Sequence, residues 1–204
     1  MFQQIENELL HVFENYRNVP NVEIEARLGW KKDRYFSANI NKDYYKLISQ
    51  QLESSNVWDK TIHNVVAEIN YGDIRKSKPL NSKPFIIKKT TIYKKDITIC
   101  DSPYDLRISV STEVPICNNI ELKPDAITCE RSKIRKSFIY KMWSYDLTQV
   151  KFDEKYMYDD EEDDIQFQFE IEFLPDTNEP TPYLAKSLTA KILDLTNVPE
   201  IKST

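Results

Sequence analysis

Strict alternation of apolar and charged residues in several short stretches is the feature that most constrains the fold of this chain. In VEIEARLG, residues 22–29, the charged residues Glu23, Glu25 and Arg27 occupy every second position between apolar ones. Successive side chains of a β-strand point to opposite faces. The stretch therefore predicts a strand that carries two carboxylates and a guanidinium on one face and an apolar surface on the other.

Three later stretches carry ionic faces of the same kind. In FQFEIEFLP, residues 167–175, the alternate residues Gln168, Glu170 and Glu172 share one face. The other two stretches are DLRISVSTEVP, whose residues on one face are Arg107, Ser109, Ser111 and Glu113, and ERSKIRKSF, whose residues on one face are Arg131, Lys133, Arg135 and Ser137.

Two explanations of these ionic faces are open. A polar face of a sheet most often meets water while the other face packs on the core. Here, however, acids follow acids in 22–29 and 167–175, and cations follow cations in 131–135. Like charges side by side destabilise a sheet, and clustered carboxylates resist joint ionisation unless a cation compensates them. Oxygen ligands suit Mg²⁺ or Mn²⁺, and a row of Lys and Arg suits phosphate. The sorting of charge thus favours a metal ion and a phosphate substrate.

The wider pattern predicts a mainly β (α+β) fold. Amphipathic helices are expected over about 2–16, about 42–53 and about 183–195, where apolar residues recur at helical spacing. No helical pattern interrupts 85–174, so an antiparallel sheet closed into an eight-stranded β-barrel with flanking α-helices is the economical topology. We expect a single domain over 1–204 with its core over about 22–174. The expected strands are 22–29, 65–75, 85–99, 106–115, 119–123, 133–141, 144–152 and 165–174.

Scarce residue types exclude several kinds of chemistry. Gly29 and Gly72 are the only glycines, and neither belongs to a glycine-rich loop that cradles phosphates. His11 and His63 are the only histidines, which leaves little for a Ser-His-Asp triad or a zinc site. Any catalysis by this chain must therefore use carboxylates, Lys and Arg. The cysteines fit no C-x-x-C zinc spacing and predict free buried thiols: Cys100, Cys117 and Cys129.

The formal net charge of −5 is an average over segregated regions. The run DDEEDD, residues 159–164, is strongly acidic, whereas 75–95 and 131–141 are strongly basic. A solvated loop between strands is the favoured explanation of the acidic run, with a metal site as the alternative. The negative net charge therefore does not exclude a polyanionic partner.

No run of about 18 apolar residues is present, and the start MFQQIENELL lacks the basic and apolar regions of a signal peptide. These features predict a soluble intracellular protein with no membrane partner.

Four motifs in order resemble the triphosphate tunnel metalloenzymes, and within them the RNA 5′-triphosphatases of fungal and large DNA virus mRNA capping. The motifs are VEIEARLG, RISVSTEVPI, KIRKSF followed by WSYDLT, and QFEIEF, and they span about 22–174. The resemblance implies an eight-stranded antiparallel tunnel with its ionic residues pointing inward. One departure is Gln168, where fungal members often carry a third alternating glutamate, and it bears on the metal preference.

The resemblance also implies residue roles. Glu113 would orient or deprotonate the attacking water, and Asp146 would position a basic side chain. Lys133, Arg135 and Arg75 would grip the terminal phosphates. The implied phosphate-binding set is Arg27, Arg75, Arg107, Arg131, Lys133 and Arg135. The implied ligands of a catalytic Mg²⁺ or Mn²⁺ are Glu23, Glu25, Glu170 and Glu172.

Simpler roles are the alternatives for several of these residues. Arg27 could only neutralise its acidic neighbours, and Asp146 could only anchor a turn or pair with a lysine. Trp143 and Tyr145 fit wall packing better than base stacking. The lysines of the basic stretch are expected in solvent or at the tunnel entrance: Lys88, Lys89, Lys94 and Lys95.

The function implied is removal of the γ-phosphate of 5′-triphosphate RNA to give 5′-diphosphate RNA, a polynucleotide 5′-phosphatase reaction that begins mRNA capping. A guanylyltransferase partner or fused domain would then follow. Rivals are a hydrolase of tripolyphosphate, thiamine triphosphate or nucleoside triphosphates, and a noncatalytic module that binds triphosphates or RNA ends. Lysine- and asparagine-rich, glycine-poor usage suits an AT-rich large DNA virus, acting in a virus factory in the host cytoplasm or in the virion.

Overall fold

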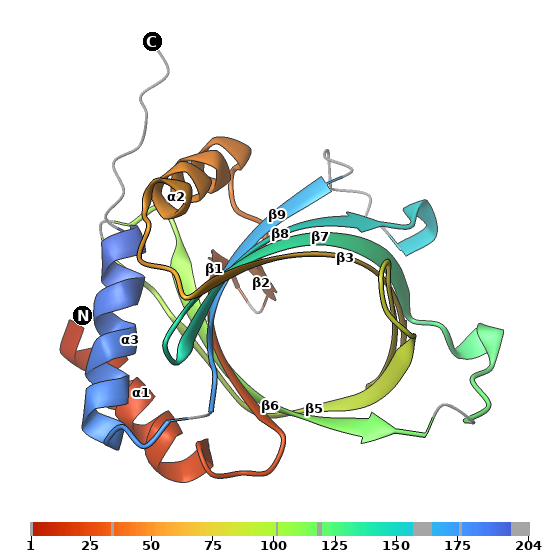
Figure 1. Ribbon diagram of the computed structural model, residues 1–204, viewed down its shortest axis with the longest axis horizontal. Helices are drawn as coiled ribbons and strands as arrows, with labels where there is room; N and C mark the ends of the chain where they lie inside the picture. The colour runs from red at the N-terminus through yellow and green to blue at the C-terminus, as the bar shows by residue number, and fades with distance from the viewer. Residues whose placement is uncertain are drawn as a thin grey trace.

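The computed structural model describes residues 2–33, 35–100, 102–117, 120–156, 165–175 and 177–196. Within them, strands make up most of the regular structure, and three α-helices flank these strands (Figure 1). The elements in chain order are α1 (Phe2–Tyr16), β1 (Val22–Lys32), β2 (Tyr35–Ser37), α2 (Lys42–Ser54), β3 (Lys60–Tyr71), β4 (Ile74–Pro79), β5 (Phe85–Ile97), β6 (Asp105–Ile116), β7 (Cys129–Tyr140), β8 (Trp143–Phe152), β9 (Ile165–Phe173) and α3 (Thr181–Thr196).

Eight of these strands close into an antiparallel barrel in the order β1-β6-β5-β4-β3-β7-β8-β9. Pairing of β1 with β9, from Ile24 opposite Phe173 to Arg27 opposite Glu170, joins the two ends of the sheet. Figure 1 looks along the resulting tunnel. The predicted closed eight-stranded antiparallel barrel with flanking helices is therefore confirmed.

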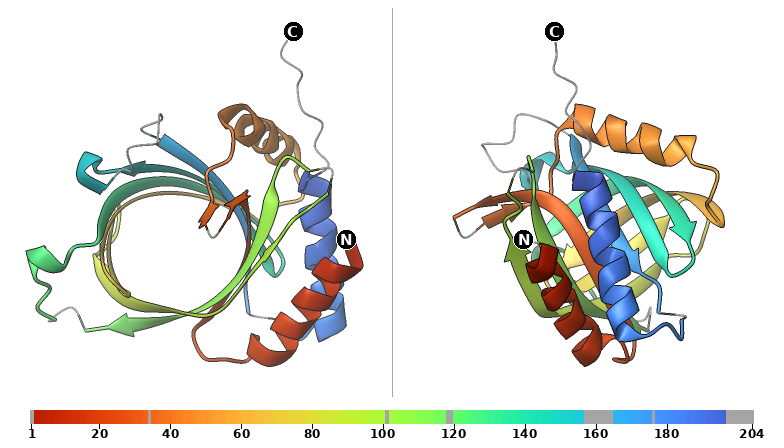
Figure 2. Two further views of the ribbon diagram at one scale, coloured as in Figure 1. Left: turned by 180° about the vertical axis from the view of Figure 1, so that it is seen from behind. Right: turned by 90° about the vertical axis from the view of Figure 1, so that its left-hand side faces the viewer.

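The short strand β2 is an addition to the predicted barrel. It pairs with β1 from Trp30 to Lys32, beyond Gly29, the last residue that β1 shares with β6. Figure 2 shows β1 and β2 continuing as a two-stranded ribbon past the rim of the barrel.

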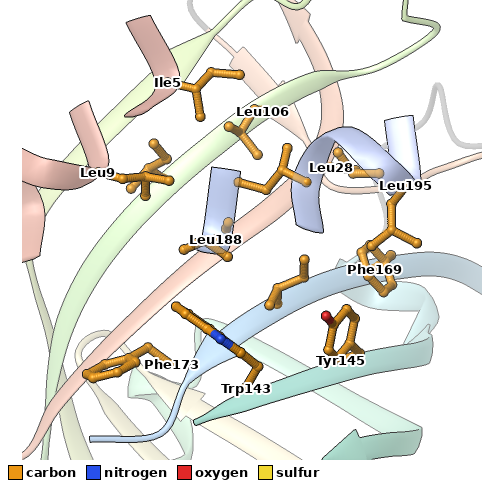
Figure 3. Packing of buried hydrophobic residues seen from close by; sticks show 14 of the residues in the cluster. Ile5, Leu9, Leu28, Leu106, Trp143, Tyr145, Phe169, Phe173, Leu188 and Leu195 are labelled. Carbon is orange, nitrogen blue, oxygen red and sulfur yellow. The ribbon is translucent and has the colours of Figure 1, made fainter. Parts of the chain in front are cut away.

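The main hydrophobic core lies outside the barrel, between its wall and the helices. Ile24, Ala26 and Leu28 alternate with the charged residues of β1 and point to this core, where all three are buried. Figure 3 shows side chains of α1 and α3 meeting those of β6, β8 and β9 there, with Trp143 and Phe173 among them. The apolar faces of β1, β6 and β9 thus pack under the helices, which leaves their ionic faces to line the tunnel.

Three expectations were wrong in detail. The expected strand over 65–75 is a hairpin of β3 and β4, whose turn contains Gly72 with a φ of 66°, a conformation that glycine adopts without steric cost. Residues 120–123 of the expected strand 119–123 are not in a strand. The cysteines are free, but Cys100 and Cys117 are exposed and Cys129 is half-buried.

Within the described ranges, the structure contains no helix of the length and apolar character needed to span a membrane.

Candidate active site

The barrel encloses a cavity of about 740 Å³ lined mostly by polar side chains. Because neighbouring residues of a strand point to opposite faces, each strand contributes every second residue. Most of the predicted site residues line this cavity together: Glu23, Glu25, Arg27, Arg75, Arg107, Glu113, Arg131, Lys133, Arg135, Glu170 and Glu172.

The acidic side of the cavity is built at the seam between β1 and β9. Glu25 lies opposite Glu172 in the pairing register, and Arg27 lies opposite Glu170. The Arg27 guanidinium donates to Glu25 Oε2 at 3.0 Å and to Glu170 Oε2 at 2.6 Å. Ser109 Oγ donates to the other oxygen of Glu25 at 2.7 Å. Arg27 therefore neutralises its acidic neighbours, one of the two roles considered for it.

Two of the carboxyl groups are poorly compensated by charge. Burial, reinforced by Glu23, Asp146 and Glu170, raises the pKa of Glu172 to about 8. Burial also raises the pKa of Glu23 to about 7, even though Lys89 donates to this carboxylate. A divalent cation is the compensation that such carboxyl groups favour, so the residues present fit Mg²⁺ or Mn²⁺.

Ion pairs already engage three of the acids on this side of the cavity. Arg27 engages Glu25 and Glu170, while Lys89 engages Glu23. Over the part of the chain that is described, no three Asp, Glu, His or Cys side chains converge closely enough to hold a metal ion as they stand. Binding of an ion by these carboxylates would therefore require some of the ion pairs to rearrange.

The basic side is organised around Glu68 of β3, which is buried. Its carboxylate accepts Arg131 Nε at 2.8 Å and Lys133 Nζ at 2.9 Å, and Arg75 Nε lies 3.9 Å away. Burial raises the pKa of Glu68, but these three cations outweigh burial and hold the pKa at about 2. Burial and the neighbouring Arg131 lower the pKa of Lys133 to about 7. The cluster is therefore rich in cations that an anionic ligand would stabilise.

Arg135 of β7 connects the basic and acidic sides. It donates to Asp146 Oδ2 at 3.0 Å, to Glu170 Oε1 at 2.6 Å and to Thr148 Oγ1 at 3.0 Å. Asp146 is 2% exposed and also accepts from Ser144 Oγ at 2.6 Å. These contacts fix the guanidinium of Arg135, so Asp146 has the geometry of a positioning residue.

Glu113 of β6 lies between two cations. It accepts Arg75 Nη2 at 2.6 Å, and Lys89 Nζ is 3.3 Å away. Burial raises the pKa of Glu113, but Arg75 and Lys89 outweigh burial and hold it below its usual value. Arg75 Nε is buried and has no hydrogen-bond partner among the described residues. The carboxylate of Glu68, 3.9 Å away, is the anion that faces this donor, so the pair is an ion pair without a hydrogen bond.

Some predictions changed when the residues were placed. Lys89 was expected in solvent or at the entrance but projects into the cavity, and Glu68 was missed. Trp143 and Tyr145 are buried in the core outside the barrel, which confirms wall packing. The acidic run 159–164 lies outside the described residues.

A closed antiparallel barrel with a charged lumen of opposed acidic and basic sides defines the class of triphosphate tunnel proteins. More specifically, the family described as "mRNA capping enzyme, beta chain" matches residues 1–179, and the chain belongs to this family. A comparison with curated protein sequences returned no match.

Solved structures share the fold. The S. pombe Pct1 RNA triphosphatase superimposes with a TM-score of 0.74 at 18% identity, covering 98% of this chain and 93% of that chain. Pct1 in complex with the Spt5 CTD gives a TM-score of 0.73 at 17% identity, with coverage of 98% and 93%. The Mimivirus capping enzyme triphosphatase gives 0.65 at 17% identity, covering 97% of each chain. At these identities the likeness is one of fold.

Proposed function

We propose that this protein is a metal-dependent RNA 5′-triphosphatase, which removes the γ-phosphate of 5′-triphosphate RNA to give the 5′-diphosphate end. One observation carries the proposal: opposed carboxylates on β1 and β9 share the cavity of a closed barrel with the cations of β4 and β7. The family to which the chain belongs supports RNA as the carrier of the triphosphate.

The residues proposed to hold Mg²⁺ or Mn²⁺ are Glu23, Glu25, Glu170 and Glu172. When bound, the ion would neutralise charge on the terminal phosphate. Glu23 and Glu172 have raised pKa values and are therefore the carboxylates that gain most from a cation.

The residues proposed to bind the terminal phosphates are Arg75, Lys133 and Arg135. Phosphoryl transfer depends on positioning and charge neutralisation more than on covalent chemistry, and a fixed guanidinium supplies both. Arg75 supports this role because its guanidinium lines the cavity between Glu68 and Glu113. Asp146 supports it indirectly by holding Arg135.

Glu113 is proposed to orient the attacking water. Its lowered pKa makes it a weak base, and its carboxylate oxygens still accept hydrogen bonds. Orientation therefore fits Glu113 better than full deprotonation of the water.

The proposal is tested by phosphate release from triphosphate-ended RNA, ATP and inorganic tripolyphosphate, each with Mg²⁺, Mn²⁺ or EDTA. We expect metal-dependent release from RNA, with a 5′-diphosphate product that a guanylyltransferase can cap. Release from tripolyphosphate or nucleotides without release from RNA would make the protein a different hydrolase. Binding of triphosphate without any release would make it a noncatalytic module.

A further inference from the structure

At the mouth of the tunnel beside the β1–β2 ribbon, three residues from three strands are stacked. An ideal Cβ at Gly29 would meet the Phe36 ring at 2.6 Å and the carbonyl oxygen of Ser37 at 2.1 Å. Only glycine therefore allows β2 to lie this close to β1. Phe36 is 7% exposed, and the guanidinium of Arg107 lies 4.3 Å from its ring centroid.

Asp96 of β5 fixes the plane of this guanidinium. Arg107 Nε donates to Asp96 Oδ1 at 2.6 Å, and Nη2 donates to Oδ2 at 2.9 Å. Asp96 reaches Arg107 because a β-bulge between Thr91 and Tyr93 shifts the register of β5 against β6. Asp96 of β5 therefore holds one edge of the Arg107 guanidinium, and Phe36 of β2 covers one of its faces.

This arrangement leaves Arg107 poorly suited to gripping phosphate. The two-pronged edge that would bind a phosphate is already bonded to Asp96, which also balances its charge. Arg107 nevertheless lines the cavity. One edge of the Arg107 guanidinium is bonded to Asp96 and one face is covered by Phe36. A nucleobase can stack on the other face of a guanidinium.

The position of Arg107 fits a nucleobase. Along β6 the residues that face the cavity run from Glu113 through Ser111 and Ser109 to Arg107. Glu23, a proposed metal ligand, lies opposite Ser111 in the pairing of β1 with β6, four residues from Arg107, roughly 13 Å at about 3.3 Å per residue. If the terminal phosphate lies beside the proposed metal ligands, an extended triphosphate that points toward this mouth brings its nucleoside to Arg107.

We propose that Arg107, stacked on Phe36, is the platform for the first nucleobase of the RNA substrate, so that this mouth is the side on which RNA enters. The proposal rests on the proposed triphosphatase function and adds to it the orientation of the substrate and a residue that recognises the nucleoside.

The test compares Arg107→Lys with the wild type on a short triphosphate-ended RNA and on inorganic tripolyphosphate, which has no base. Lysine keeps the charge but lacks the plane. We expect the ratio of KM for RNA to KM for tripolyphosphate to rise about tenfold, the size of one base-stacking contact. A loss of equal size on both substrates would make Arg107 a phosphate ligand, and no change on either would also overturn the proposal.

The matched control is Trp30→Ala. Trp30 is 50% exposed and lies on the other face of the same ribbon, because it alternates with the residues that face Phe36. We expect the KM ratio of this variant to equal that of the wild type. A raised ratio in Trp30→Ala with none in Arg107→Lys would place stacking on the outer face and refute the assignment.

The two proposals fail in different ways. Absence of phosphate release from RNA by the wild-type protein would contradict the proposed function. Normal release from RNA by the wild type, with an unchanged KM ratio in Arg107→Lys, would contradict only the proposed stacking role of Arg107. Thermal melts of both variants show whether any change comes from loss of folded protein.

Discussion

Glu25 of β1 and Glu172 of β9 lie directly opposite each other across the pair of strands that closes the barrel. Like charges opposite each other destabilise a sheet, so ionisation of both residues at this seam is unfavourable. Arg27 and Ser109 compensate Glu25, whereas Glu172 keeps a raised pKa. A cation bound beside Glu172 would therefore stabilise the closure of the barrel.

Mg²⁺ or Mn²⁺ should raise the melting temperature of the wild-type protein. A ligand present at 100 times its Kd stabilises the folded state by about 2.7 kcal/mol. Glu172→Gln should lose most of this gain, together with phosphate release, because it removes a proposed ligand. The control is Glu14→Gln, which removes the same charge from the exposed side of α1. An equal metal-induced shift in Glu172→Gln and wild type would contradict the ligand assignment.

Lys133→Ala should lower kcat/KM for triphosphate-ended RNA by about 10²- to 10³-fold, the usual cost of removing one preorganised charge from a reacting centre. Lys136→Ala provides the comparison, since Lys136 belongs to the same strand but pairs with Glu53 outside the barrel. Steady-state kinetics of the two variants on triphosphate-ended RNA measure this difference in kcat/KM. Similar small effects of both substitutions would move Lys133 out of the phosphate site.

Asp146→Asn should reduce kcat more than it changes KM, because Arg135 would lose the partner that fixes its guanidinium. Loss of hydrogen bonds to a charged group costs about 1.5–3 kcal/mol, so the free energy of unfolding should fall modestly. Combining Asp146→Asn with Arg135→Lys should cost less than the sum of the single effects, since both remove one interaction. Additive losses in kcat would show that the two residues act independently.

In EDTA, stability should pass through a minimum near pH 7 to 8. The pKa values of Glu23 and Glu172 are raised to about 7 and about 8, so the folded state binds extra protons and loses stability as pH rises from about 4.5 toward 8. Lys133 has a pKa lowered to about 7, so the unfolded state binds the extra proton above that pH, and stability recovers.

Urea denaturation from pH 5 to pH 10 measures this profile. Glu172→Gln should flatten the decline on the acidic side and leave the alkaline recovery in place. A wild-type profile that rises steadily from pH 5 to pH 8 would contradict the assignment of raised carboxyl pKa values.

The sequence was most informative where both faces of a strand have a demanding environment. β1 and β9 pack apolar residues under the helices and present charged residues to the lumen, so their alternation is strict and the barrel could be predicted from it. β3, β4 and β5 have outer faces in solvent, as the exposure of Val65 and Lys88 illustrates. Polar residues then occur on both faces of these strands, so alternation did not identify Glu68 and Lys89 as residues that face the lumen.

Local irregularities account for other misses. The bulge at Thr91 and Tyr93 changes which residues of β5 face inward, so Asp96 could not be placed beside Arg107 by counting. The hairpin between β3 and β4 could have been found, because Gly72 followed by Asp73 is a turn signal. Ion pairs such as Arg107 with Asp96 depend on register and could not be read from the sequence.

The placement of the main apolar core outside the barrel separates two kinds of selection on this molecule. Substitutions under α1 and α3 act on the stability of the fold, whereas substitutions in the lumen act on which ligand the tunnel can bind. The ligand specificity of such a tunnel can therefore change during evolution while the hydrophobic core that stabilises the fold stays the same.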